Sequence, residues 1–115
     1  MSARRHDLHL RVKLGKTDAF GPGKAALLEG IRQSGSIAQA GRSMKMSYAR
    51  AWRLVQAMNG EFRAPLVRSA KGGAARGGAT LTALGEQVLR RYRSIERRAA
   101  SAAGADLRVL RGLAR

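Results

Sequence analysis

Cysteine is absent from the 115-residue chain, which excludes disulfide bonds and zinc sites built on thiolates. The chain has only two histidines, His6 and His9, and both lie close to the N-terminus, so neither a metal centre nor another cofactor is expected. No apolar run approaches the roughly 18 residues that a membrane-spanning helix needs, and the first residues lack the hydrophobic stretch of a signal peptide. The length suffices for one modest core. We therefore expect a single cytoplasmic domain with no membrane partner.

Acidic residues are scarce as well. The chain has 7 aspartates and glutamates against 23 lysines and arginines, which gives a formal net charge of +16. With so few acids and histidines, the folded region offers no acid–base pair or nucleophile–base spacing, so an enzyme is not expected. Between Glu29 and Glu86 the only acid is Glu61, whereas nine basic residues fall in that stretch. Such a charge would strain a compact fold unless a polyanion shares it, and it therefore indicates a nucleic-acid partner.

Hydrophobic periodicity predicts the first two elements. Apolar and polar residues alternate strictly over residues 8–14, which is typical of a half-buried strand. Residues 20–23 (Phe-Gly-Pro-Gly) predict a turn. Helical spacing follows over residues 26–34, and Gly35 stops it. Residues 1–7 are expected to be a flexible arm ahead of the strand and the first helix.

A helix-turn-helix is predicted next. Ser36 is a good N-cap, and apolar residues follow it at spacings of three and four to about residue 43. Ser47 caps a third helix, residues 47–59, in the position of a recognition helix. The core face of this helix is predicted to consist of Ala51, Leu54, Val55 and Met58. The residues of the two helices predicted to contact DNA are Ser36, Gln39, Ser47, Tyr48, Ala49, Arg50, Trp52, Arg53 and Gln56.

The third helix suggests separate roles for its polar residues. Arg53 lies nearest the middle of the outward face and is predicted to contact a guanine base, whereas Arg50 at the flank is expected to meet phosphate. Tyr48 and Trp52 lie between the outward face and the core face, so sealing the edge of the core and facing the groove both remain open. The start of the second helix could hold a phosphate, although capping alone explains its serine.

A basic β-hairpin, or wing, is predicted after Pro65. Residues 66–69 and 79–82 have the pattern of two strands, and the segment between them is rich in glycine with two basic residues. The glycines also match part of a nucleotide-binding loop, but Ala79 stands where that loop requires lysine. The segment is interpreted as either a phosphate-contacting tip or a solvated loop. The wing residues predicted to contact DNA are Arg68, Lys71, Gly72, Gly73, Arg76, Gly77 and Gly78.

A long helix is predicted from Thr82 onward. At some 20 residues it would be about 30 Å long and would extend beyond the core of one small domain. Leu84 and Val88 are expected to reach that core, and the rest of an apolar stripe is expected to pair with a second chain. Gly104 ends or bends the helix, and residues 106–114 predict one more short amphipathic piece. The residues predicted to form the dimerisation stripe are Leu84, Val88, Tyr92, Ile95, Ala99 and Ala102.

Two features together resemble a known family. Ser47-Tyr48 with Ala51-Trp52, combined with a glycine-rich wing at the right distance, is similar to the N-terminal winged-helix domain of molybdate-responsive (ModE-type) transcription regulators. The helix-turn-helix also resembles that of LysR-type regulators, and the whole resemblance covers roughly residues 8–103. It implies a homodimer joined through the long C-terminal helix and bound to a palindromic operator. Complete members of the family add molybdate-binding domains, so this chain resembles a stand-alone form that lacks them.

These observations predict a mainly α fold with a small antiparallel β wing, that is, a winged helix-turn-helix with a long C-terminal dimerisation helix. The expected division is a flexible arm at 1–7, a DNA-binding domain at 8–82, and a dimerisation helix and tail at 83–115. The predicted function is that of a dimeric, sequence-specific transcription regulator that binds double-stranded DNA. Two alternatives stay open: a nucleoid-type architectural or RNA-binding basic protein, and a regulator that responds to an oxyanion such as molybdate.

Overall fold

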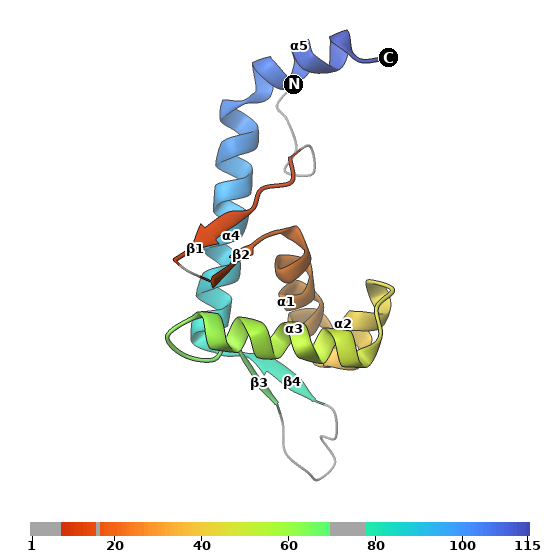
Figure 1. Cartoon of the computed structure of the whole chain (residues 1–115), viewed down its shortest axis with the longest axis vertical. Helices are drawn as coiled ribbons and strands as arrows, with labels where there is room; N and C mark the ends of the chain where they lie inside the picture. Colours follow the sequence, from red (N-terminus) through yellow and green to blue (C-terminus); the bar gives the residue numbers. More distant parts are fainter. Residues whose placement is uncertain (1–7, 16, 70–77) are drawn as a thin grey trace.

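The fold is mainly helical with a small antiparallel β3–β4 wing, as predicted, and it also contains an N-terminal β1–β2 hairpin whose second strand was not predicted. The computed structural model describes residues 8–15, 17–69 and 78–115. In chain order its elements are β1 (Val12–Leu14), β2 (Thr17–Phe20), α1 (Pro22–Ser34), α2 (Ile37–Ser43), α3 (Tyr48–Glu61), β3 (Val67–Ser69), β4 (Ala79–Leu81), α4 (Ala83–Ala102) and α5 (Gly104–Leu113). Figure 1 shows α4 running from the β3–β4 hairpin to α5 at the opposite end of the molecule. No helix in the described ranges is both long and apolar enough to cross a membrane.

The N-terminal hairpin pairs β1 with β2. The predicted alternation is confirmed, because the apolar residues between 8 and 14 are half-buried and the polar ones are exposed. Strand β1 is shorter than the predicted strand at 8–14, because only Val12–Leu14 pair with β2. The predicted turn at 20–23 is wrong. Phe20 ends β2 with its ring buried, and Pro22 begins α1, where its fixed φ and missing N–H cost nothing.

Capping residues lie at three predicted helix ends, namely the end of α1 and the starts of α2 and α3. Gly35 ends α1 with a φ of 71°, and its N–H donates to the Ile31 carbonyl at 2.8 Å. The Ser36 hydroxyl accepts from the Gln39 N–H at 3.1 Å, and the Ser47 hydroxyl accepts from the Arg50 N–H at 3.1 Å. Helix α3 ends at Glu61, slightly beyond the predicted end at residue 59.

The core lies between α1, α2, α3 and the start of α4. Its largest fully buried side chains are Leu27, Leu28, Ile31, Val55, Met58 and Leu66. Small residues let the helices approach closely: a Cβ added to Gly41 would lie 2.8 Å from the Ala51 Cβ, and one on Gly30 would lie 2.9 Å from the Ala40 Cβ. The helix-turn-helix is therefore held as one packed unit, with the predicted core face of α3 buried or half-buried.

The wing strands are held to α3 by one side chain. The Asn59 Oδ1 accepts from the N–H groups of Leu66 and Val67 at 2.9 and 3.1 Å, and its Nδ2 donates to the Val67 carbonyl at 3.1 Å. Strand β3 pairs with β4 in the register Val67↔Leu81 to Ser69↔Ala79. Each strand is one residue shorter than predicted, because Leu66 and Thr82 instead bond to each other where the hairpin meets α4.

Helix α4 begins at the predicted cap, and Leu84 and Val88 pack against the core as predicted, although the residues that the helix buries most deeply lie on another face. The Thr82 hydroxyl accepts from the Gly85 N–H at 3.0 Å and donates to the Pro65 carbonyl at 2.7 Å. The residues of α4 that are buried are Gly85, Leu89, Tyr92, Glu96 and Ala100. Only Tyr92 belongs to both this face and the predicted stripe, and it lies in the core of its own chain rather than beyond it.

Candidate nucleic-acid interface

Helix α3 presents one face to solvent while its other face is anchored in the core. Ala51, Val55 and Met58 are fully buried on the inner side. The predicted contact residues on the outer side are all exposed: Ser47, Tyr48, Ala49, Arg50, Trp52, Arg53 and Gln56. The prediction that this helix is amphipathic and outward-facing is therefore confirmed. The contacts it would make with DNA stay a prediction.

Two large aromatic residues on this face, Tyr48 and Trp52, are well exposed to solvent. Tyr48 is 54 % exposed and Trp52 is 44 % exposed. They lie four residues apart and so one above the other on the helix surface. Both rings are therefore available to solvent, and a partner that covered α3 would bury them.

The base of the wing lies beside the start of α2. Ser36 and Gly78 form an isolated antiparallel bridge, and the Ala79 N–H donates to the Gly35 carbonyl at 2.8 Å. This contact brings the predicted residues Ser36, Gln39 and Gly78 to one edge, with Gln39 exposed. The Ser36 hydroxyl accepts a capping hydrogen bond, which confirms the N-cap predicted for this residue.

The remaining wing residues divide into two groups. Arg68 lies exposed on β3, opposite Thr80 of β4. Lys71, Gly72, Gly73, Arg76 and Gly77 lie outside the described residues. Their predicted phosphate contacts therefore stay predictions.

The one carboxylate of α2 and α3, that of Glu61 at the end of α3, is paired with Lys24. All four glutamates form ion pairs: Lys24 with Glu61 at 2.9 Å, Arg32 with Glu86 at 3.0 Å, and Arg93 with Glu29 at 3.0 Å and with Glu96 at 2.8 Å. In the part of the chain that the structure describes, no carboxylate pairs with the four basic residues of the helix-turn-helix surface, which are Arg42, Lys45, Arg50 and Arg53. This surface is therefore uniformly basic and suited to a polyanion.

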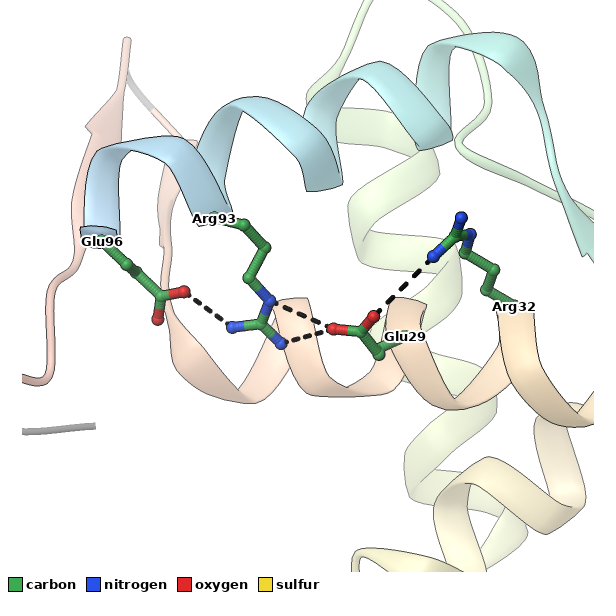
Figure 2. A network of polar contacts seen from close by, with 4 residues as sticks. All are labelled: Glu29, Arg32, Arg93 and Glu96. Atoms are coloured by element: carbon green, nitrogen blue, oxygen red, sulfur yellow. Dashed lines mark hydrogen bonds and ion pairs between the residues drawn. The ribbon is translucent and has the colours of Figure 1, made fainter. Parts of the chain in front are cut away.

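An ion-pair network joins α1 to α4, and it was not predicted from the sequence. Figure 2 shows Arg93 reaching Glu29 on α1 and Glu96 on its own helix, with Arg32 beside Glu29. Although Arg93 is charged, its side chain is only 15 % exposed. The one local signal is the i,i+3 spacing of Arg93 and Glu96, whereas Glu29 is distant in sequence.

Two groups in this region have raised pKa values. Burial raises the pKa of the Tyr92 hydroxyl, and the negative charge of Glu96 adds to the effect. This hydroxyl donates to the Leu10 carbonyl at 2.6 Å. Burial alone would lower the pKa of Arg93, but its hydrogen bonds with Glu96 and Glu29 outweigh that effect and raise it. Both groups therefore keep their protons at neutral pH.

An open apolar groove of about 440 Å³ lies between the β1–β2 hairpin and α4. Four residues of the predicted dimerisation stripe line it: Leu84, Val88, Tyr92 and Ile95. Ile95 is 43 % exposed, and beyond it Ala99 is half-buried and Ala102 exposed. Helix α5 carries three further exposed apolar residues, Val109, Leu110 and Leu113.

Among the described residues, no group of three or more histidine, aspartate or glutamate side chains is placed to hold a metal ion. The arrangement assembled here is thus an exposed basic helix on a packed scaffold, with an apolar groove elsewhere on the molecule. Such an arrangement can bind a polyanion through charge, hydrogen bonds and surface shape.

Comparison with known proteins gives partial matches. No family model matches the chain. It is 46 % identical over 86 residues to the molybdenum-pterin-binding protein MopB of Rhodobacter capsulatus, a match that covers 74 % of this chain and 32 % of that protein. It is 37 % identical over 91 residues to the transcriptional regulator ModE of Haemophilus influenzae, covering 79 % of this chain and 36 % of that protein.

A third relative is the DNA-binding transcriptional dual regulator ModE of Escherichia coli K12, with 35 % identity over 86 residues, 75 % of this chain and 33 % of that protein. The chain spans about a third of the length of these curated relatives. The predicted resemblance is supported at this level. Over about three quarters of its length, the chain is related to part of the ModE-type proteins.

Proposed function

We propose that this chain is a dimeric, sequence-specific DNA-binding transcription regulator that inserts α3 into the major groove. One observation carries the proposal: a capped helix, anchored by its buried face, presents Arg50 and Arg53 on an outer face with no carboxylate partner among the described residues. The names of the ModE relatives, a transcriptional regulator and a DNA-binding regulator, support it. The molybdenum-pterin binding in the name of MopB is no part of the proposal, since the match covers only 32 % of that protein.

The proposed contacts divide between bases and backbone. Arg53, near the middle of the outer face, would donate two hydrogen bonds to a guanine edge, while Arg50 at the flank would meet a phosphate. The Tyr48 hydroxyl would also reach the backbone. From the wing and its base, the residues proposed to contact phosphate are Gln39, Arg68, Lys71 and Arg76.

Dimerisation through α4 completes the proposal. In this division, residues 8–82 bind DNA and residues 83–115 join two chains. The exposed Ile95 and the apolar groove beside it support a partner on this side of α4, because an open apolar surface of this kind usually has one. Two chains related by a two-fold axis would present their recognition helices to half-sites about 34 Å apart, or a multiple of that distance.

Selection from a random pool of double-stranded DNA tests the function directly. The bound fragments are sequenced after several rounds, and we expect a palindromic consensus with two half-sites. Enrichment of no sequence, with binding that depends only on salt, would contradict the proposal and favour the architectural or RNA-binding alternative. A single half-site without a palindrome would support DNA binding and contradict the dimer.

Replacing Arg53 with alanine is expected to weaken cognate binding and relax one base position. A bidentate contact to guanine discriminates by about 1 to 3 kcal/mol, and that discrimination would be lost. Titration of cognate and scrambled duplexes measures both parts of the effect. The matched control is Arg97→Ala on the exposed side of α4, because Arg93 is held in the ion-pair network and its loss would disturb packing. Equal losses on cognate and scrambled DNA would contradict the base contact.

A further inference from the structure

Five charged residues form one alternating ladder across α1 and α4. Helix α1 contributes Glu29 and Arg32, and α4 contributes Glu86, Arg93 and Glu96 (Figure 2 shows four of them). The Arg32 Nε lies 3.0 Å from Glu86 and its Nη1 lies 3.9 Å from Glu29. The Arg93 Nε and Nη2 donate to the same Glu29 oxygen at 3.1 and 3.0 Å, and its Nη1 donates to Glu96 at 2.8 Å. Each arginine thus joins carboxylates from both helices.

The ladder holds α4 at two separate points. Glu86 and Arg93 are seven residues apart, which is about 10.5 Å along a helix. A single contact would let α4 pivot against α1, whereas two contacts at this separation also restrain the angle between the helix axes. The two ends differ in exposure, since the Arg32 side chain is 55 % exposed and the Glu96 side chain only 5 %.

Stability alone does not explain the buried end of this ladder. Moving a carboxylate and a guanidinium out of water is costly, and apolar residues of similar size often stabilise such a site as well or better. A guanidinium, however, fixes direction as well as distance, because its planar fork donates to two carboxylates at set angles. Leucine or methionine in the same place would pack, but would tolerate several arrangements of the two helices.

We propose that this ladder, centred on Arg93, is an orientation element that sets the angle at which α4 leaves the helix-turn-helix. In a dimer joined through α4, that angle determines the distance between the two recognition helices. A change of about 10° over a helix about 30 Å long moves its far end by about 5 Å, more than the rise of about 3.4 Å per base pair. Arg93, Glu29 and Glu96 are therefore positioning residues for half-site spacing. This inference rests on the proposed function.

The first test measures the orientation within one chain and without DNA. Since the chain has no cysteine, Ala57→Cys on the exposed side of α3 and Ser101→Cys on the exposed side of α4 give two clean sites for spin labels. Dilution with unlabelled chain restricts the measurement to label pairs within one chain. We expect one narrow distance distribution in the native background and a clearly broader or shifted one with Arg93→Met/Glu96→Leu. The control is an exposed arginine on the same helix, and Arg97→Met should leave the distribution unchanged.

The second test measures spacing preference on palindromes whose half-sites are separated by different numbers of base pairs. We expect the Arg93→Met/Glu96→Leu chain to keep its affinity for a single half-site and to lose roughly tenfold in preference for one spacing, which corresponds to about 1.4 kcal/mol. Unchanged label distances and an unchanged spacing preference in a folded variant would overturn the inference.

A more exposed variant covers the case in which the buried replacement does not fold. Arg32→Gln removes the outer contact with Glu86, where both side chains are well exposed, and should broaden the same label distances to a smaller extent. An unchanged distribution in this variant, with the double variant unfolded, would also overturn the inference. A native chain that binds no spaced palindrome contradicts the proposed function instead, and the label distances within one chain still test the ladder.

Discussion

Replacing Ile95 with lysine is expected to give a folded monomer whose affinity for a palindromic operator falls by a factor of roughly 10² to 10⁴, since binding through two linked half-sites is lost. The fold should tolerate the change, because Ile95 is 43 % exposed and lies outside the buried core. In the proposed dimer the same side chain would lie between two chains, where two lysines would place like charges in an apolar seam. Sedimentation measures the assembly, and titration on full and half operators measures the binding.

A matched charge elsewhere on α4 separates the seam from simple electrostatics. Ser101→Lys adds the same charge on the exposed side of the helix, and this variant should remain dimeric with near-native operator affinity. Two results would contradict the dimer proposal. One is a native chain that sediments as a monomer at micromolar concentration in moderate salt, and the other is an Ile95→Lys variant that still dimerises.

Replacing Gly85 with alanine is expected to remove a large share of the folding stability. A Cβ at this position would lie 2.2 Å from the Leu66 carbonyl oxygen, a backbone atom that also accepts the Thr82 N–H at 2.9 Å. Overpacking of a core usually costs about 1 to 3 kcal/mol. The cost should reach or exceed the upper value here because two backbones must separate, and that is a large share of a typical stability of about 5 to 15 kcal/mol.

Gly60→Ala is the control for this prediction. It lies within α3, and nothing lies within 4 Å of an added Cβ, so alanine should raise the stability by about 0.5 to 1 kcal/mol. Urea unfolding followed by circular dichroism compares the two variants with the native chain. If the Gly85→Ala chain unfolds at the same urea concentration as the native chain, α4 can move away from Leu66 at little cost, and the prediction is wrong.

The elements that could be predicted from the sequence are those defined by local chemistry. The hydroxyls of Ser36, Ser47 and Thr82 each accept a hydrogen bond from a backbone N–H three residues later, so the cap and the helix start appear together in the sequence. Gly35 ends α1 because its φ of 71° suits glycine. The exposed face of α3 could also be predicted locally, because the spacing of its apolar residues places the buried side and therefore the opposite, exposed side.

The buried face of α4 could not be predicted from periodicity. Counting apolar residues selects the stripe through Leu84 and Ile95, whereas the face that packs on the core includes the charged residue Glu96. Glu96 is tolerated there because Arg93 bonds to it, and Arg93 in turn bonds to Glu29, 64 residues away in sequence. A pattern that treats every charge as solvent-facing cannot detect a partner at that distance.

The candidate site shows the same division. Exposure of the α3 residues was predictable, since it depends on one helix and its core. The neighbourhood of Ser36 and Gly78 was not, because it depends on a bridge between the start of α2 and the far strand of the hairpin.

The pairing of all four glutamates has an effect on how salt acts on this protein. With those carboxylates engaged, the net charge of +16 rests largely on basic side chains that repel one another across the free molecule. Added salt screens that repulsion and thus favours the folded free chain, but it also removes the entropic gain from the counterions that a nucleic acid releases on binding. For the proposed nucleic-acid complex, ionic strength therefore acts in opposite directions on folding and on binding, and the unbound chain is least stable at the low salt where it would bind most tightly.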